Sequence, residues 1–306
     1  MKDIKDAKGD EKGKEKPWHK ISIKLPFSYK RLILIPLALL ILSVFVLSYQ
    51  YYQTGEWFKR SIELRGGTQL NIKSSDAVDI KKIDDLLSRD FGSVNVRELR
   101  GFGEYGALIE FDDETDYNAV LDRLRAGGID VSEYSVEKFG ASISSVFWSQ
   151  AQIGIIISFV LMAIFVFLAF RTLVPSLAVI ASAASDIIMT LAGMQAFGIE
   201  FSLASLGALL MLIGYSVDTD IMLTTRVLRE TEKMSVDEKI LGAIKTGLTM
   251  TLTSIGAVLV ILIIPLPEVL VNIASIIFLG LMADILNTWL MNSVLLKWYA
   301  ESRGAA

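Results

Sequence analysis

Four aspartates lie inside strongly apolar stretches of this sequence. Asp186 and Asp284 each lie near the middle of such a stretch, and Asp218 and Asp220 lie two residues apart toward the end of another. A carboxylate at the centre of a membrane-spanning helix costs several kcal/mol, so it usually faces the bundle interior or water and has a role. An aspartate that changes partners during a transport cycle would bind and release a proton. These four residues are therefore candidates for a proton relay.

Each aspartate also has a structural explanation. A buried aspartate can accept hydrogen bonds from Ser, Thr or Asn on a neighbouring helix and so fix the packing, and Asn287 could give such polar support. Arg226, which follows Asp218 and Asp220, has two explanations as well. It is either a cationic anchor near the cytoplasmic end of a span or a counter-ion to the acidic pair. The residue types alone leave both open, so Arg226 joins the candidate relay residues.

Helical geometry separates Asp218 from Asp220. Residues two apart on a helix point about 200° apart, so the two carboxylates cannot face the same partner. Gly207 and Gly214 share a stripe with Asp218, and small residues let helices approach closely. The spacing therefore predicts that Asp218 packs inside the bundle. It leaves Asp220 to face a cavity, another subunit or the cytoplasmic interface.

The composition argues against several other kinds of site. The chain has no cysteine, and its single histidine, His19, cannot form a histidine metal cluster. No nucleophile, base and orienting group occur together in a recognisable motif, so we predict no enzyme, no catalytic residue, no metal and no cofactor. Residues 101–106 match G-x-G-x-x-G, but they lie between two predicted strands, which favours a hairpin turn over a dinucleotide site. We expect no nucleic-acid partner.

The elements that must position the aspartates are membrane spans. The chain has 306 residues, of which 52% are hydrophobic, and the apolar residues gather in runs. Six runs approach the length of about 20 residues that crossing a bilayer requires: 32–49, 151–170, 173–194, 201–223, 248–264 and 269–296. The first lacks the small-residue cleavage pattern of a signal peptide, which favours an uncleaved anchor.

The region between the first two spans is charged and has a different pattern. Strands are predicted at 68–73, 93–99, 107–112 and 131–139, and helices at 78–91 and 117–125. This β-α-β-β-α-β order is that of the ferredoxin-like fold. The predicted fold class is a polytopic α-helical membrane protein of six transmembrane helices, with an α+β ferredoxin-like domain inserted between helices 1 and 2.

The positions of Lys and Arg predict how the chain lies in the membrane. When the chain alternates sides, the Lys and Arg residues near span ends all fall on one side, which marks that side as cytoplasmic. We therefore expect a multi-pass plasma-membrane protein, surrounded by the lipid bilayer, with both termini in the cytoplasm. The predicted regions are a disordered basic tail at 1–30, transmembrane helix 1 at 31–50, an extracytoplasmic domain at 51–148, transmembrane helices 2–6 at 149–298 and a cytoplasmic tail at 299–306.

Two motifs carry a resemblance to a known family. The first, SIELRGGT, follows the first span and contains Arg65, Gly66, Gly67 and Thr68. The second is GYSVDTD at 214–220, which continues to an arginine six residues on. With the six spans and the large loop after the first, these motifs resemble the SecD/SecF family of protein-export membrane proteins, and most closely its archaeal SecF branch. The resemblance extends over about residues 30 to 300.

This resemblance implies half of a bundle related to the resistance-nodulation-division (RND) transporters, completed by the six spans of a partner, SecD. It also implies an accessory role at a SecY-type translocon, where the proton gradient helps to draw unfolded preproteins outward. The family's acidic and basic residues in this span would map to the Asp218/Asp220 pair and Arg226. One departure is that bacterial members usually have a single aspartate here, preceded by asparagine, whereas two aspartates flank Thr219 in this chain.

Two other functions fit the same residues. The chain could be half of a proton-linked small-molecule exporter of the RND type, although such exporters usually carry larger outer domains than one ferredoxin-like unit. It could also be a non-transporting scaffold that stabilises a translocon complex, in which case the aspartates would be packing elements. Neutralising the aspartates separates these possibilities, because a scaffold would lose assembly rather than a proton-linked step.

Overall fold

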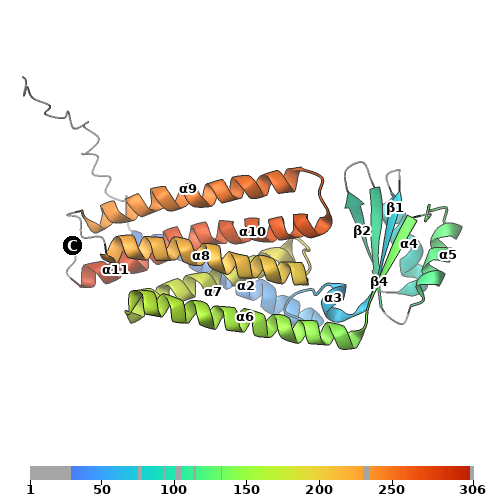
Figure 1. Cartoon of the computed structure of the whole chain (residues 1–306), viewed down its shortest axis with the longest axis horizontal. Helices are drawn as coiled ribbons and strands as arrows, with labels where there is room; N and C mark the ends of the chain where they lie inside the picture. The colour runs from blue at the N-terminus through green and yellow to red at the C-terminus, as the bar shows by residue number, and fades with distance from the viewer. Residues whose placement is uncertain are drawn as a thin grey trace, which may run out of the picture.

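The computed structural model describes residues 29–74, 78–92, 94–100, 105–112, 115–131, 133–229 and 234–303. Nearly all of the predicted tail at 1–30, the end of the tail at 299–306 and most of the glycine-rich segment at 101–106 lie outside these ranges. Figure 1 shows an elongated molecule with a bundle of long helices at one end and a small sheet domain at the other. The last helix, α11 (Ser293–Ser302), lies at the end of the bundle far from the sheet domain.

Six helical segments are long and apolar enough to cross a membrane. They are α2 (Leu34–Thr54), α6 (Ala141–Phe170), α7 (Leu173–Ala196), α8 (Leu203–Arg229), α9 (Val236–Ile263) and a last segment made of α10 (Glu268–Leu286), the π-helical turn η1 (Asn287–Asn292) and α11 (Ser293–Ser302). A short helix, α1 (Tyr29–Leu32), precedes α2. Each of the six long segments overlaps one of the six predicted spans, so the predicted six-helix architecture is confirmed.

Two spans begin earlier than hydrophobicity predicts. The helix α6 starts at Ala141 rather than at 151, because its first turns are rich in serine and extend beyond the apolar run. It therefore begins inside the range 51–148 that we predicted for the soluble domain. The helix α9 starts at Val236 rather than at 248, because Ser235 and Glu238 form a capping box that begins the helix well before its apolar part.

The sheet domain, residues 67–139, has the predicted ferredoxin-like order. It consists of β1 (Gly67–Ser74), α4 (Ile80–Phe91), β2 (Asn95–Arg100), β3 (Tyr105–Phe111), α5 (Tyr117–Ala126) and β4 (Glu133–Phe139). The strands are antiparallel in the order β2-β3-β1-β4. Side chains alternate along β1: Leu70 and Ile72 join the core beneath α4 and α5, whereas Gln69 and Asn71 line a cleft on the other face.

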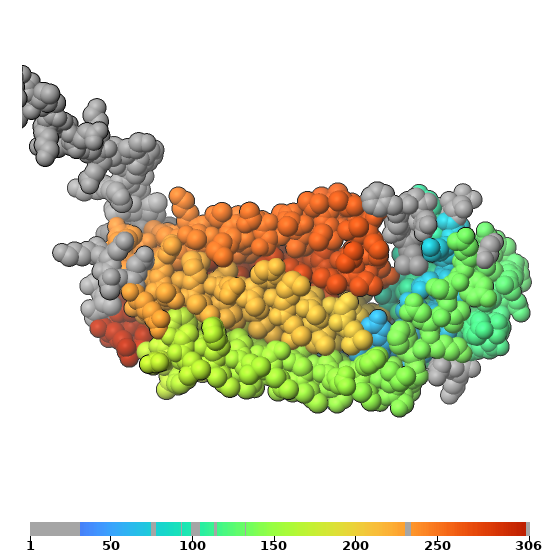
Figure 2. Space-filling model, viewed as in Figure 1, coloured from blue at the N-terminus to red at the C-terminus, as the bar shows by residue number. Residues whose placement is uncertain are grey.

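A tight turn connects the short helix α3 (Ile62–Arg65) to β1 and explains two glycines of the SIELRGGT motif. Gly66 and Gly67 have φ angles of +88° and +136°, which L side chains rarely adopt. A Cβ atom on Gly67 would also lie 2.7 Å from the carbonyl oxygen of Phe111 and 2.8 Å from Ile62 Cδ1. The turn places the sheet domain against one end of the bundle (Figure 2).

The helices α8 and α10 pack closely in the bundle. Gly280 on α10 faces Leu212 on α8, and an added Cβ atom would lie 2.2 Å from the leucine side chain. A side chain here would require Leu212 to move, so glycine permits this close approach. Buried apolar side chains of the same two helices join one core cluster: Leu209, Leu212, Ile276, Ile277 and Leu281. This packing fixes the relative positions of the helices that hold Asp220 and Asp284.

Candidate functional site: a buried carboxylate cluster

Three of the four intramembrane aspartates lie in one polar cluster inside the bundle. Asp186 on α7, Asp220 on α8 and Asp284 on α10 each have 0% of their surface exposed. The hydrogen-bond donors to these carboxylates come from α8 and η1, both within the spans. All three carboxylates are thus buried inside the bundle, although the spacing left Asp220 to face a cavity, another subunit or the cytoplasmic interface.

A single threonine connects two of the carboxylates. The hydroxyl oxygen of Thr288 lies 3.0 Å from Asp220 Oδ1 and 2.9 Å from Asp284 Oδ1. A threonine hydroxyl has one hydrogen, so it can donate to only one of these oxygens. The second short contact is a hydrogen bond only if the other carboxyl is protonated and donates to the Thr288 oxygen. The geometry therefore fits one proton shared between Asp220 and Asp284 through Thr288.

Thr219 can accommodate Asp284 in either protonation state. Its hydroxyl oxygen lies 3.0 Å and 3.2 Å from the two carboxylate oxygens of Asp284, and 2.8 Å from the carbonyl oxygen of Ser216. When Thr219 donates to Asp284, the contact suits an ionised carboxylate. When it donates to the Ser216 carbonyl, its oxygen is free to accept a hydrogen bond from protonated Asp284. The Thr219 hydroxyl can thus turn between Asp284 and the Ser216 carbonyl as Asp284 loses or gains a proton.

Asp186 and Asp220 differ in how many of their oxygens are held. Asp186 accepts hydrogen bonds on both oxygens, from Asn287 Nδ2 at 2.6 Å and from the hydroxyl of Ser216. Asp220 accepts from Asn292 Nδ2 at 2.6 Å and shares Thr288, both on Oδ1. Its Oδ2 is buried without a partner among the described residues.

The π-helical turn η1 supplies the two amide donors. Asn287 and Asn292 are five residues apart, and on a regular α-helix they would point about 140° apart. In η1 both reach the cluster, one bonding Asp186 and the other Asp220. Such π-helical turns occur frequently at functional sites. The sequence marks the two asparagines as polar residues in an apolar span, but nothing in it predicts the wider turn.

The structure reverses the predicted roles of Asp218 and Asp220. Asp218, Gly207 and Gly214 are exposed on the outside of α8, and a Cβ atom on either glycine would meet nothing within 4 Å. The prediction that Asp218 packs inside the bundle is therefore wrong. Gly207, Gly214 and Asp218 do form one stripe on α8, but this stripe faces away from the other described helices of the chain. The inward face of α8 instead carries Ser205, Leu209, Leu212, Ser216, Asp220, Leu223 and Val227.

Arg226 is not a counter-ion of the cluster. Its Nη1 donates to the hydroxyl of Thr246 on α9 at 3.2 Å. In the described part of the chain it forms no ion pair with a carboxylate. Of the two explanations left open by the sequence, the structure therefore favours a cation near the end of its helix. Three residues that the sequence did not single out complete the cluster: Ser216, Thr219 and Thr288.

Comparison with known proteins places the cluster within a family. The model of the family described as "Protein export membrane protein SecD/SecF, C-terminal" matches residues 119–302, which contain all three buried aspartates. The protein-export membrane protein SecF of Methanocaldococcus jannaschii is 43% identical over 280 residues, covering 89% of this chain and 95% of the relative.

Solved structures share the fold. SecDF from Thermus thermophilus, described as a translocon-associated membrane protein, matches with a TM-score of 0.72 at 21% identity, covering 89% of this chain and 38% of that one. A heavy metal efflux pump matches with a TM-score of 0.50 at 10% identity, covering 90% of this chain and 49% of that one. The chain thus spans less than half of either solved chain. On the family model and the extensive identity to its relative, this chain belongs to the SecD/SecF family of protein-export membrane proteins.

Proposed function

We propose that this chain is the SecF-type accessory subunit of protein export and that it passes a proton between Asp284 and Asp220 through Thr288. The observation that carries the proton step is the single Thr288 hydroxyl within hydrogen-bond distance of two fully buried carboxylates. The export role is supported by a relative named for protein export that aligns over nearly its whole length.

The step moves one proton and leaves the threonine unchanged. Protonated Asp284 donates to the Thr288 oxygen while the Thr288 hydrogen goes to Asp220 Oδ1, so the negative charge moves from α8 to α10. Thr219 then turns its hydroxyl toward the newly ionised Asp284. A proton crossing the membrane potential supplies about 2.3 kcal/mol per 100 mV. That free energy can change how α8 and α10 pack against each other.

The orientation follows the charge distribution. Five basic residues lie at helix ends or connections on the side of the bundle away from the sheet domain: Arg171, Arg226, Arg229, Lys239 and Lys297. We therefore infer that this side is cytoplasmic, with both termini there, and that the sheet domain lies outside. In that position the sheet domain can meet an unfolded preprotein leaving a SecY-type translocon.

The outer face of α8 supports a membrane partner. Asp218 is exposed within a span, and a carboxylate facing lipid is costly. Gly207 and Gly214 leave open space along the same face, where another helix can approach closely. We infer that this face contacts a SecD-type partner, which would shield Asp218 from lipid.

The test compares export in inside-out membrane vesicles with and without a proton gradient. Asp220→Asn and Asp284→Asn should lose the gradient-stimulated part of export, because neither can carry the proton, while the SecD-type partner still co-purifies. Asp122→Asn, an exposed aspartate on α5, is the matched control and should export like the wild type. Full gradient stimulation in both cluster variants would contradict the proposal.

The same experiment separates the alternatives. A scaffold role predicts that the cluster variants lower recovery of the partner complex and lose export in proportion to that recovery. A small-molecule exporter would show substrate-dependent proton flux in proteoliposomes with no effect of the variants on preprotein export. Normal assembly combined with lost gradient stimulation fits only the proposed relay.

A further inference from the structure

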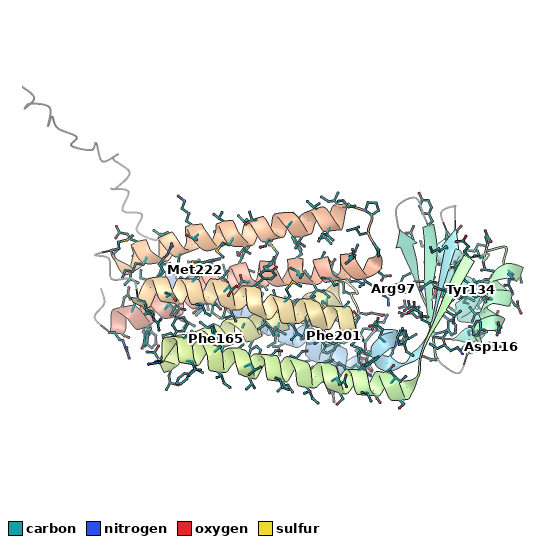
Figure 3. All side chains as sticks on the ribbon, viewed as in Figure 1. Arg97, Asp116, Tyr134, Phe165, Phe201 and Met222 are labelled. Atoms are coloured by element: carbon teal, nitrogen blue, oxygen red, sulfur yellow. The ribbon has the colours of Figure 1, made fainter. Side chains whose placement is uncertain are left out.

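Arg97 on β2 contacts glutamates from three separate segments of the chain. Its guanidinium lies 3.2 Å from Glu110 Oε2 on β3 and 3.2 Å from Glu268 Oε1 at the start of α10, and it also pairs with Glu200 just before α8. In Figure 3, Arg97 lies in the space between the sheet domain and the bundle. We call Arg97 with these three glutamates the Arg97 latch.

Two of the three latch glutamates are buried, and the latch is supported by further polar contacts. Glu110 and Glu200 are only 3% and 4% exposed. Asn95 Nδ2 donates at 3.2 Å to an oxygen of each. Lys59 pairs with Glu200 at 2.7 Å, and Arg65 lies 3.6 Å from Glu110. Removing one partner from a buried network leaves an uncompensated charge, unlike the loss of an exposed pair.

The Arg97 latch and the covalent connections to the bundle are attached to different strands of the sheet. The chain enters the domain at β1 and leaves it at β4, which are neighbours in the order β2-β3-β1-β4. Arg97 is on β2, the edge strand on the far side. Between the sheet and the helix ends lies a cleft of about 460 Å³, lined by Asn71, Ser135, Leu108, Val269 and Asn272 among others. The domain is therefore connected covalently on one side and held by the latch on the other.

Two glutamates of the latch lie at the ends of helices that hold the carboxylate cluster. Glu200 lies just before α8, which holds Asp220, and Glu268 begins α10, which holds Asp284. The planar guanidinium presents its donors in a fixed fork, so it bonds both glutamates only while the ends of α8 and α10 keep their spacing. We propose that Arg97 is a positioning residue that transmits a change in the spacing of α8 and α10 to the sheet domain. This coupling rests on the proposed function.

The chain offers a direct test because it contains no cysteine. Spin labels at Lys81→Cys on α4 and Ile263→Cys at the end of α9 report the distance between the sheet domain and the bundle. The full chain with its SecD-type partner, in proteoliposomes, should show one narrow distance distribution that shifts when a proton gradient is imposed. Arg97→Gln should broaden the resting distribution and lose the shift.

Two further variants keep the test decisive. Glu268→Gln removes only the ion pair with α10, so it should fold normally and still lose the gradient-dependent shift. Arg123→Gln removes an ion pair with Asp90 on the helical side of the sheet domain and should behave like the wild type. The coupling is overturned if both Arg97→Gln and Glu268→Gln keep the wild-type shift. It is also overturned if the wild-type distance does not change when the gradient is imposed.

The latch and the proton relay can fail separately. If Asp220→Asn and Asp284→Asn export with full gradient stimulation, the proposed function fails, whatever the distances show. If those variants lose stimulation while Arg97→Gln keeps the wild-type distribution and shift, the relay stands and the Arg97 coupling is wrong. A shift lost in Arg97→Gln and kept in Arg123→Gln supports the coupling.

Discussion

The position of hydroxyl and amide donors gives the three buried carboxylates different surroundings. Asp186 accepts a hydrogen bond on each oxygen, so both of its oxygens are held in place. Asp220 and Asp284 instead share the one hydrogen of Thr288. A proton therefore has two positions in that pair, one on each carboxyl. We assign the moving proton to Asp220 and Asp284, whereas Asp186 is a fixed acceptor for Asn287 and Ser216.

In the Arg97 latch, Glu110 should make the protein's free energy of unfolding depend on pH. Burial raises the pKa of Glu110 above its ordinary value of 4.5, although Arg97 acts in the opposite direction. The folded protein then holds this proton more tightly than the unfolded chain. Glu110 therefore contributes stability that is complete below about pH 4.5 and is lost as the pH rises through its raised pKa. Glu110→Gln should lack this contribution, as measured by thermal unfolding of the purified chain between pH 7.5 and pH 5.

The control for this prediction is Glu137→Gln, an exposed glutamate on β4 of the same domain. It should keep the pH dependence of the wild type. If Glu110→Gln also kept it, Glu110 would not be the group that titrates. The carboxylates that face Glu110 include Glu200 across Arg97, so the double variant Glu110→Gln/Glu200→Gln shows whether the second glutamate contributes.

At the residue scale, sequence could predict which residue types matter but not which face of α8 points inward. Polar residues in an apolar span are visible in any sequence, and Asp186, Asp220, Asp284 and Asn287 are all in the cluster. The choice between Asp218 and Asp220 was wrong because a glycine stripe marks close helix approach without saying which helix approaches. The Ser205, Ser216 and Asp220 stripe on the same helix was the better guide to the interior.

At the scale of elements, periodicity predicted all six spans and the ferredoxin-like order. The first residues of α6 and α9 were not predicted, because a serine-rich first turn and a capping box, rather than hydrophobicity, determine where those helices begin. The turn η1 was missed because its i to i+5 pattern has no compositional signature. It is nevertheless the element that brings Asn287 and Asn292 to the same cluster.

The turn from α3 to β1 gives a prediction about an element boundary. Gly67→Ala should lower the free energy of unfolding by roughly 2 kcal/mol or more, because the residue needs a positive φ and its Cβ atom would overlap Phe111 and Ile62. Gly140→Ala is the matched control, with a φ of −63° and open space around its Cβ position. Thermal unfolding of both variants measures the difference. Equal melting temperatures would show that the turn tolerates a side chain.

At the scale of the whole molecule, the chain has two surfaces that it does not fill itself. One is the outer face of α8 with Gly207, Gly214 and Asp218, and the other is the cleft beneath the sheet domain. Sequence alone predicted a partner through family resemblance, but it assigned the α8 stripe to packing within the chain. A single sequence does not separate contacts within a chain from contacts between chains.

The outer face of α8 gives a prediction about assembly. Gly207→Leu and Gly214→Leu should leave the isolated chain stable, because nothing lies within 4 Å of either Cβ position. Both should reduce recovery of a SecD-type partner by filling the space that a neighbouring helix would use. Gly154→Leu on α6, where the Cβ position is also open, is the control. Full recovery of the partner with both α8 variants would place the interface elsewhere.

The central claim is that Asp220 and Asp284 share one proton through Thr288. Infrared spectroscopy of the purified chain in lipid tests it most directly, because a protonated carboxyl has a C=O stretch distinct from that of a carboxylate. We predict a protonated carboxyl band at neutral pH that weakens in Asp220→Asn/Asp284→Asn, shifts in Thr288→Val and stays unchanged in Asp122→Asn. A wild-type spectrum without this band, or a band that is the same in Asp220→Asn/Asp284→Asn as in the wild type, would contradict the shared proton.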